Sequence, residues 1–226
     1  KLKTLEKALT AMRGQPGIIF CNFKDALERV SDFLTKNDIN HECFHGGMEQ
    51  IDRERSLIKF RNGSNQLLLA TDLAARGLDI PEIKFIIHYH LPLHNKEFTH
   101  RNGRTARMNR NGIAYIIKWE EEPLPDFILE TEAKIENIET LEKMTLANPV
   151  KWQTLYISGG RIDKISKGDV AGLFFKQGGI KKEQLGVIEL KQNCSYVGVH
   201  SDIAEILINK TNNSKLKKKK VRISII

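Results

Sequence analysis

The sequence predicts an α/β domain built on a parallel sheet, followed by a small α+β domain with the order βαββαβ. Short apolar runs alternate with amphipathic stretches as far as Lys118. This alternation indicates βαβ units whose strands are buried on both faces. Asn148-Pro149 breaks the pattern and coincides with a change in charge. We therefore expect one domain over residues 1–148 and a second over residues 149–226.

The elements of the first domain follow from apolar spacing and turn residues. Leu2, Leu5 and Leu9 recur at helical spacing until Gly14-Gln15-Pro16-Gly17 ends the pattern. The expected helices are Lys1–Arg13, Lys24–Lys36 and Gln50–Arg61, and the expected strands are Ile18–Phe20, a segment near Cys43, Leu67–Leu69, Ile83–His88 and Gly112–Lys118. An arginine-rich loop is expected before the last strand, and Asp126–Lys143 is compatible with a further helix.

Shorter signals predict the second domain. Ser166-Lys167-Gly168-Asp169 resembles a capping box, and Gly178-Gly179 ends the apolar helix that follows it. A second helix is expected over Ser201–Lys210, and strands are expected at Thr154–Ile157, Leu185–Leu190, Tyr196–Val199 and Val221–Ile225. This order is the ferredoxin-like split unit.

Positive charge is concentrated in the second domain. The chain has 226 residues and a net charge of +8, and the 76 residues from Lys151 onward hold 15 basic and 6 acidic residues. A local net charge of +9 is typical of a surface that binds nucleic acid. No apolar run suits a membrane span, and three scattered cysteines suggest neither a disulfide framework nor a zinc site. We expect a cytoplasmic protein without a membrane partner.

The segment Ala70-Thr71-Asp72-Leu73-Ala74-Ala75-Arg76-Gly77-Leu78-Asp79-Ile80-Pro81 follows an expected strand. Ligands of open α/β sheets gather beyond the carboxyl ends of the strands. There Thr71 could donate its hydroxyl to a phosphate, Gly77 permits close backbone approach, and Asp79 could accept from a sugar hydroxyl. A turn capped by Asp72 explains the same residues, and the segment alone does not separate the two interpretations.

A second motif, His100-Arg101-Asn102-Gly103-Arg104-Thr105-Ala106-Arg107, precedes the last expected strand of the first domain. Arg104 and Arg107 are three residues apart and can converge on one target. Guanidinium groups match phosphate oxygens and can neutralise charge that develops during phosphoryl transfer. The alternative is a solvated basic face.

In order, these segments resemble the second RecA-like domain of the DEAD-box ATP-dependent RNA helicases. The resemblance covers roughly Lys1 to Lys118 and includes Gln50-Ile51-Asp52-Arg53, which continues to Phe60-Arg61-Asn62-Gly63. It implies that Arg104 and Arg107 are arginine fingers at the γ-phosphate of ATP, that Asp79 contacts the ribose, and that Gly77 belongs to the same nucleotide site. It also implies that His100 couples the ATP site to the other domain.

The same resemblance assigns the RNA backbone to Gln50, Arg53 and Thr71. Phe23 stands where relatives usually carry threonine, which leaves a contact at that position open. Asn102 replaces an aliphatic residue, and we expect it to change packing more than chemistry.

The sequence contains neither G-x-x-x-x-G-K-[ST] nor a D-E-A-D run. We therefore expect a C-terminal piece of a helicase, in which a first domain holds the ATP phosphates and Mg²⁺. The piece alone is predicted to have no ATPase activity.

The second domain resembles an RRM, and its Tyr156 and Tyr196 are expected to face away from the helices and to stack on RNA bases. Half-buried strand filler is an equal alternative, because Gly198 leaves the stacking surface incomplete.

Three short segments of the second domain resemble the RNA-binding domain of DbpA/YxiN-like helicases. They are Thr154-Leu155-Tyr156-Ile157-Ser158-Gly159-Gly160, Lys167-Gly168-Asp169-Val170 and Val221-Arg222-Ile223. That resemblance implies binding to a hairpin of large-subunit ribosomal RNA and a role in assembling that subunit. Arg161, Lys164 and Lys167 are the expected contacts, because they cluster where a helix N-terminus adds backbone donors.

Two other functions stay open at the level of sequence. One is a non-catalytic RNA-binding or annealing protein, and the other is a DNA-directed translocase. The RRM-like domain favours RNA over DNA, and we expect a monomer.

Overall fold

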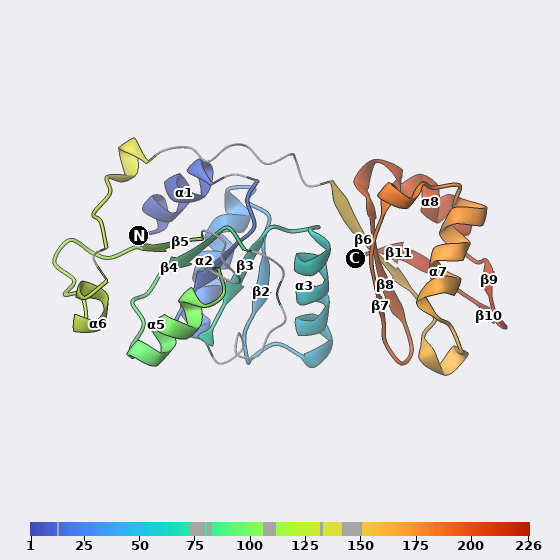
Figure 1. Cartoon of the computed structure of the whole chain (residues 1–226), viewed down its shortest axis with the longest axis horizontal. Helices are drawn as coiled ribbons and strands as arrows, with labels where there is room; N and C mark the ends of the chain where they lie inside the picture. Colours follow the sequence, from blue (N-terminus) through green and yellow to red (C-terminus); the bar gives the residue numbers. More distant parts are fainter. Residues whose placement is uncertain (13, 73–79, 81–82, 106–111, 132, 142–150) are drawn as a thin grey trace. The chain divides into compact units, whose positions relative to one another are not determined.

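A computed structural model describes residues 1–12, 14–72, 80, 83–105, 112–131, 133–141 and 151–226. The chain divides into two compact units, Lys1–Leu57 with Gln66–Pro149 and Ile58–Asn65 with Val150–Ile226 (Figure 1). The boundary predicted between residues 148 and 149 lies outside the described residues.

A five-stranded parallel sheet forms the centre of the first unit, as predicted. Its strand order is β2-β3-β1-β4-β5. The strands are β1 (Gly17–Phe20), β2 (Glu42–Phe44), β3 (Leu67–Ala70), β4 (Phe85–His88) and β5 (Ile113–Ile116). The α-helices up to residue 129 are α1 (Leu2–Ala11), α2 (Lys24–Lys36), α3 (Gln50–Asn62), α5 (Asn95–Asn102) and α6 (Asp126–Leu129).

The central strands β1 and β4 are buried along their whole length. The apolar faces of α1 and α2 pack in the same core, where Leu5 and Leu27 have no exposed surface. Gly17 is required at its position, because a Cβ there would lie 2.3 Å from the ring of Phe85. Burial on both faces explains why these strands have continuous apolar sequences.

Two segments of this unit differ from the sequence prediction. The first residues of the predicted arginine-rich loop are helical, because they form the end of α5. This helix buries Phe98 and Arg101 and has Glu97 in its first turn. Among the described residues of Asp126–Lys143, those that are helical lie in α6 and in a 3₁₀ turn at Ile138–Thr140, and residues 133–137 are not helical. Ile135 is 98% exposed. The segment therefore has no continuous apolar face to stabilise a long helix.

The second unit contains a four-stranded antiparallel sheet with the order β11-β6-β8-β7. Its strands are β6 (Trp152–Ile157), β7 (Leu185–Leu190), β8 (Ser195–His200) and β11 (Ile223–Ile225), and its α-helices are α7 (Lys167–Leu173) and α8 (Ala204–Thr211). The order βαββαβ is confirmed. Short helical turns lie at η2 (Arg161–Asp163), η3 (Phe174–Gly178), η4 (Lys182–Gln184) and η5 (Ser201–Ile203).

The predicted helix signals of this unit are present. Ser166 and Asp169 form the capping box at the start of α7. The π-helical turn η3 extends α7, and Gly179 follows it with φ +72°. That left-handed conformation suits glycine, which explains why the helix ends there.

A hairpin that the sequence did not predict lies between α8 and β11. Its strands are β9 (Lys215–Leu216) and β10 (Lys219–Lys220). A run of lysines carries no alternation that would indicate a strand, so the sequence predicts no element at this tract.

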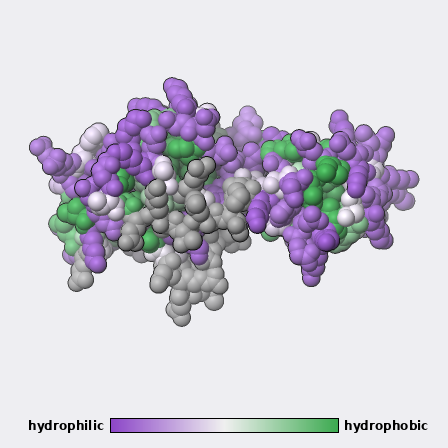
Figure 2. Space-filling view, turned by 90° about the horizontal axis from the view of Figure 1, so that it is seen from above, coloured by the Kyte–Doolittle hydropathy of each residue, from purple (hydrophilic) through white to green (hydrophobic). Residues whose placement is uncertain are grey.

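Side-chain hydropathy follows the expected pattern of two separate cores. In each unit a cluster of apolar side chains is buried, and hydrophilic residues cover much of the face shown in Figure 2. None of the helices in the described ranges is long and apolar enough to cross a membrane.

Candidate functional site

The candidate site lies at the edge of the parallel sheet where the strands end. β1 is paired with β3 and β4 in parallel register, so Phe20 lies between Ala70 and His88. The segments that follow these three strands therefore meet at one edge. They carry Asn22 after β1, Thr71 and Asp72 after β3, and the link from β4 to helix α5.

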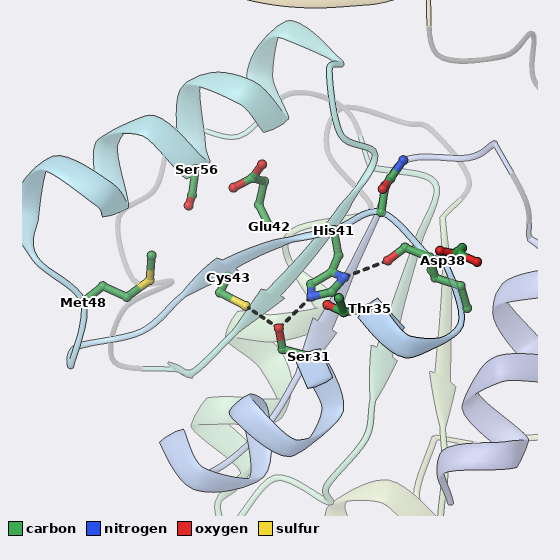
Figure 3. A pocket seen from close by; sticks show the side chains of 10 residues that line it. Ser31, Thr35, Asp38, His41, Glu42, Cys43, Met48 and Ser56 are labelled. Atoms are coloured by element: carbon green, nitrogen blue, oxygen red, sulfur yellow. Dashed lines mark hydrogen bonds between the residues drawn. The ribbon is translucent and has the colours of Figure 1, made fainter. Parts of the chain in front are cut away.

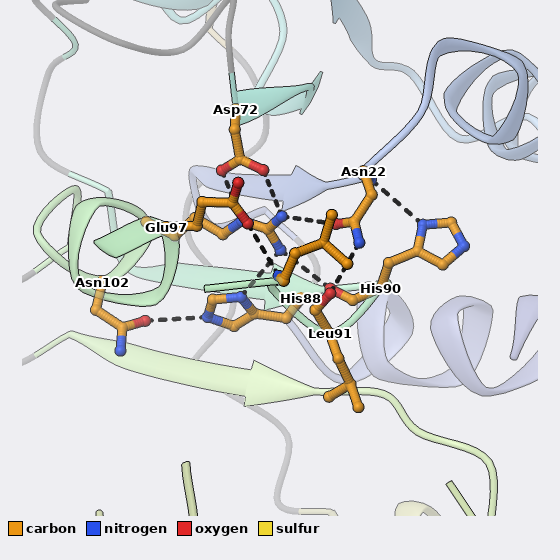
Figure 4. A network of polar contacts seen from close by, with 9 residues as sticks. Asn22, Asp72, His88, His90, Leu91, Glu97 and Asn102 are labelled. Carbon is orange, nitrogen blue, oxygen red and sulfur yellow. Dashed lines mark hydrogen bonds and ion pairs between the residues drawn. The ribbon is translucent and has the colours of Figure 1, made fainter. Parts of the chain in front are cut away.

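Arg101 on α5 is the centre of a polar network at this edge, and its side chain is 1% exposed. Its Nε donates to Asp72 Oδ1 at 2.8 Å, and its Nη2 lies 2.5 Å from Asp72 Oδ2. Nη2 also donates to Asn22 Oδ1 at 2.7 Å, and Nη1 donates to the His90 carbonyl at 3.0 Å. In Figure 4, Asn22, Asp72 and His88 are directed toward a common centre. A charged group can be buried here because these partners occupy its donors.

His88 extends this network toward the end of α5. Its Nδ1 lies 3.3 Å from Arg101 Nη1, and its Nε2 lies 3.0 Å from Asn102 Oδ1. Arginine can only donate, so Nδ1 accepts and the ring proton is assigned to Nε2. Asn102 thus accepts a hydrogen bond from a fully buried histidine. The expectation that Asn102 changes packing more than chemistry is wrong, because an aliphatic side chain could not accept this proton.

Burial lowers the pKa of His88 to about 4; the hydrogen bond to Asn102 opposes this shift, and the Arg101 charge adds to it. The folded state therefore holds a neutral imidazole, whereas the unfolded chain binds a proton near pH 6.5. Since the unfolded state takes up this proton more readily, stability from this group is lost as the pH falls from about 6.5 toward 4.

We expect His88 to lower the free energy of unfolding by about 3 kcal/mol as the pH falls from about 6.5 to about 4. Urea unfolding from pH 4.5 to 7.5 tests this, with His88→Gln as the comparison. The other histidines are common to both proteins, so the stability difference between them should change with pH only through His88. A difference that stays constant across the range would contradict the assignment.

His100 and Arg104 lie at the end of α5 and just beyond it, and neither side chain is buried. The amide of Arg104 donates to the carbonyl of Arg101 at 3.0 Å, so the backbone of the candidate finger is tied to that of the anchored arginine three residues earlier. Thr105 is buried and donates to the Ile83 carbonyl at 2.9 Å. The segment is therefore fixed by backbone and side-chain contacts on both sides of Arg104. Gly77, Asp79 and Arg107 lie outside the described residues.

The predicted RNA-backbone residues occupy the neighbouring half of the edge. Gln50 and Arg53 lie in the first turn of α3, after the carboxyl end of β2, and Arg53 Nη2 donates to Gln50 Oε1 at 2.8 Å. Thr71 follows β3, and its amide donates to the Phe44 carbonyl at 3.2 Å. Because β2 and β3 are adjacent, the fold brings these three residues to one region of the edge. Phe23 follows β1 and is 62% exposed.

The tyrosines of the second unit are only partly as predicted. Tyr156 and Tyr196 lie opposite each other on adjacent strands, with ring centroids 5.8 Å apart in an edge-to-face arrangement. Tyr156 is partly exposed, but Tyr196 is only 2% exposed, so the prediction of two open stacking surfaces is wrong for Tyr196. Residues 58–65 belong to the same unit and contact this face of the sheet, where Arg61 pairs with Glu189, the cross-strand neighbour of Tyr196, and Asn62 donates to Thr154.

Arg161, Lys164 and Lys167 are exposed, as expected for residues that contact a ligand. Arg161 belongs to η2, Lys164 follows it with φ +58°, and Lys167 is the first residue of α7. The structure therefore places all three around the start of this helix.

A separate pocket of about 450 Å³ runs along β2 between α2 and α3 (Figure 3). It is lined by Ser31, Thr35, Asp38, Ile39, Asn40, His41, Glu42, Cys43, Met48 and Ser56. Cys43 donates to Ser31 at 3.3 Å, Ser31 Oγ lies 2.7 Å from His41 Nε2, and burial raises the pKa of Cys43. None of the predicted site residues lines it. Across the described ranges, no three His, Cys, Asp or Glu residues are grouped to hold a metal ion.

Comparisons with known proteins agree with the two units. Residues 1–109 match the model of the helicase conserved C-terminal domain, and residues 154–225 match that of the DbpA RNA binding domain. The chain is 30% identical to the ATP-dependent RNA helicase DbpA of Escherichia coli K12 over 100% of this chain and 50% of that protein. It is 28% identical to the Bacillus subtilis protein of the same name, over 99% of this chain and 52% of that one.

Among solved structures, the yeast DEAD-box splicing factor Prp28 superimposes with a TM-score of 0.50 and 31% identity, covering 54% of this chain and 27% of that chain. The chain spans about half the length of the two bacterial relatives.

Proposed function

This chain belongs to the DEAD-box family of RNA helicases, and on that basis we propose that it acts as the C-terminal portion of an ATP-dependent RNA helicase. The observation that carries the proposal is the buried Arg101 network. It fixes the segments after β1, β3 and β4 to α5 at the ligand edge of the sheet. The same function is supported by the two bacterial relatives, which are both named ATP-dependent RNA helicases and of which this chain covers about half.

In the proposed mechanism, the parallel-sheet unit closes onto a first RecA-like domain that holds ATP and Mg²⁺. When bound, ATP would supply the phosphoanhydride bond whose hydrolysis transfers the γ-phosphoryl group to water and drives the cycle. In this proposal Arg104 and Arg107 neutralise charge on that group, Asp79 contacts the ribose, and Gly77 belongs to the same nucleotide site. His100 couples this site to the first domain.

Gln50, Arg53 and Thr71 hold the backbone of one RNA strand in the closed state. Their side chains can donate hydrogen bonds to phosphate oxygens, which position a strand without reading its sequence. Closure bends the strand and separates local base pairs. The second unit keeps the enzyme near its target by raising the effective concentration of RNA.

We propose that the target is a hairpin of large-subunit ribosomal RNA and that the protein acts in assembly of that subunit. The match to the DbpA RNA binding domain and the net charge of +9 after residue 150 support RNA as the ligand.

Phosphate release by this chain, alone and joined to the first RecA-like domain of its own protein, tests the proposal. We expect hydrolysis only from the joined protein with RNA present, because the chain alone lacks a phosphate-binding loop. The joined protein should be stimulated more strongly by large-subunit ribosomal RNA than by an unrelated RNA of equal length. RNA-stimulated turnover by the chain alone, or equal stimulation by both RNAs, would contradict the corresponding part of the proposal.

A further inference from the structure

The hairpin β9–β10 of the second unit is almost entirely lysine. Five of the six residues from Lys215 to Lys220 are lysine, and Leu216 is the exception. Leu216 is 5% exposed and belongs to the apolar core of the unit. This apolar side chain anchors the hairpin, and the lysines lie at the surface. The lysine tract is therefore an ordered part of the fold.

Two ion pairs fix the hairpin to the start of α7. Lys217 Nζ lies 2.9 Å from Asp169 Oδ1, and Lys219 Nζ lies 2.9 Å from Asp163 Oδ2. Both carboxylates are themselves held, because Asp169 accepts from the amide of Ser166 and Asp163 accepts from the amide of Gly160. The lysines are therefore positioned next to η2 and α7.

This arrangement joins two basic groups into one surface, which we call the hairpin patch. It comprises Arg161, Lys164, Lys167, Lys217, Lys218, Lys219 and Lys220. Seven positive charges surround two carboxylates, Asp163 and Asp169, which gives a net charge of +5. The end of the unit where β9 and β10 lie in Figure 1 is hydrophilic in Figure 2. Such a concentration of like charge is unfavourable by itself and suits a polyanion.

An apolar side chain lies within the same surface. Ile162 in η2 is 64% exposed, although its neighbours Arg161 and Lys164 are basic. The backbone of η2 is fixed, because the amides of Arg161 and Ile162 donate to the carbonyls of Lys191 and Gln192 at 3.0 and 3.1 Å. Ile162 is therefore held at the surface, where it can contact an unstacked base or a ribose.

We infer that the hairpin patch is the surface with which the second unit binds RNA. Its lysines contact phosphates, and Ile162 contacts an unpaired base. The outer face of the sheet is less suited to this role, because Tyr196 is nearly inaccessible there. This inference rests on the proposed function, in which the unit binds RNA, and it adds where the contact lies.

Two double substitutions with the same change in charge test this inference on the whole chain. Lys164→Gln with Lys218→Gln alters the patch, and Lys181→Gln with Lys182→Gln alters exposed lysines beyond the other end of α7. The probe is a fluorescein-labelled RNA hairpin with a single-stranded tail, and its affinity is measured by anisotropy at several KCl concentrations.

We expect the patch variant to bind at least about tenfold more weakly at 0.1 M salt, and the slope of log affinity against log salt to fall by nearly 2, because about two phosphate contacts are lost. The control variant should bind within about twofold of the unmodified chain. Ile162→Ala should weaken binding about threefold with an unchanged salt slope, because it removes no charge.

Equal weakening by the two double variants would overturn the inference, since binding would then depend only on total charge. A larger loss from Tyr156→Ala than from the patch variant would also overturn it and assign RNA to the sheet face. If the unmodified chain does not bind the probe at all, the proposed RNA-binding function itself is contradicted. Thermal unfolding of each variant shows whether the unit is still folded.

Discussion

Replacement of Arg104 and Arg107 by alanine in the protein that includes the first RecA-like domain is expected to lower RNA-stimulated ATP turnover by about 10³-fold or more. Guanidinium groups that stabilise a transferring phosphoryl group contribute effects of about 10³ to 10⁵ in turnover. Arg104 is partly exposed, and its amide donates to the carbonyl of the anchored Arg101, so the backbone that carries the proposed finger is held in place. RNA affinity should be largely kept, because neither arginine belongs to the group assigned to the RNA backbone.

Single-turnover hydrolysis and RNA binding are measured on the same preparations. Arg29→Ala is a suitable control, because Arg29 is an exposed arginine of α2 outside the proposed site. The single Arg107→Ala variant should already lose most of the turnover. Unchanged turnover in the single and double variants would remove both residues from the catalytic assignment.

Arg101→Ala is expected to have the largest effect on folding, a loss of about 3–5 kcal/mol in the unfolding free energy of the parallel-sheet unit. Removal of the guanidinium leaves the carboxylate of Asp72 without its bidentate partner and leaves Asn22 Oδ1 and the His90 carbonyl without a donor. The loss of one member of a buried ion pair typically destabilises a protein by this amount.

Native-state hydrogen exchange can measure this effect separately in the two units. Amides of β1 and β4 report on the parallel-sheet unit, and amides of β8 serve as an internal reference. Addition of Asp72→Ala to Arg101→Ala should recover part of the stability, because it removes the unpaired carboxylate. Arg29→Ala should change exchange of the β1 and β4 amides by less than about 0.5 kcal/mol. If Arg101→Ala left the hydrogen-exchange protection of the β1 and β4 amides unchanged, the network would not stabilise the unit.

Much of the fold could be predicted because local sequence and tertiary packing favour the same elements. Strand β7 has the predicted limits, Leu185–Leu190, and helix α2 has the predicted limits, Lys24–Lys36. Apolar spacing and turn residues specify both elements locally. The hairpin β9–β10 could not be predicted in this way, because its stability depends on Leu216 reaching the core and on Lys217 and Lys219 meeting distant carboxylates.

The site shows the same division. The motif around His100 led to the prediction that Arg104 and Arg107 act on a phosphate, but it assigned no role to Arg101. A buried arginine with a neutral histidine beside it can be recognised only when Asp72, Asn22 and His88 are brought together from different strands. Tyr196 illustrates the reverse case. Alternation along β8 places it on the face opposite the core, yet only 2% of it is exposed, because residues 58–65, which are distant in sequence, contact that face.

The sequence by itself determined the order of most elements, the class of each unit, the likeness to the DEAD-box helicases and the basic character of the second unit. These properties depend on short-range spacing, local turn chemistry and total charge, all of which are written along the chain. Only the tertiary structure decided which polar groups are buried together around Arg101 and where the lysines of the hairpin gather. Those properties depend on contacts between residues far apart in sequence, and such contacts exist only when the sheet and its helices have assembled.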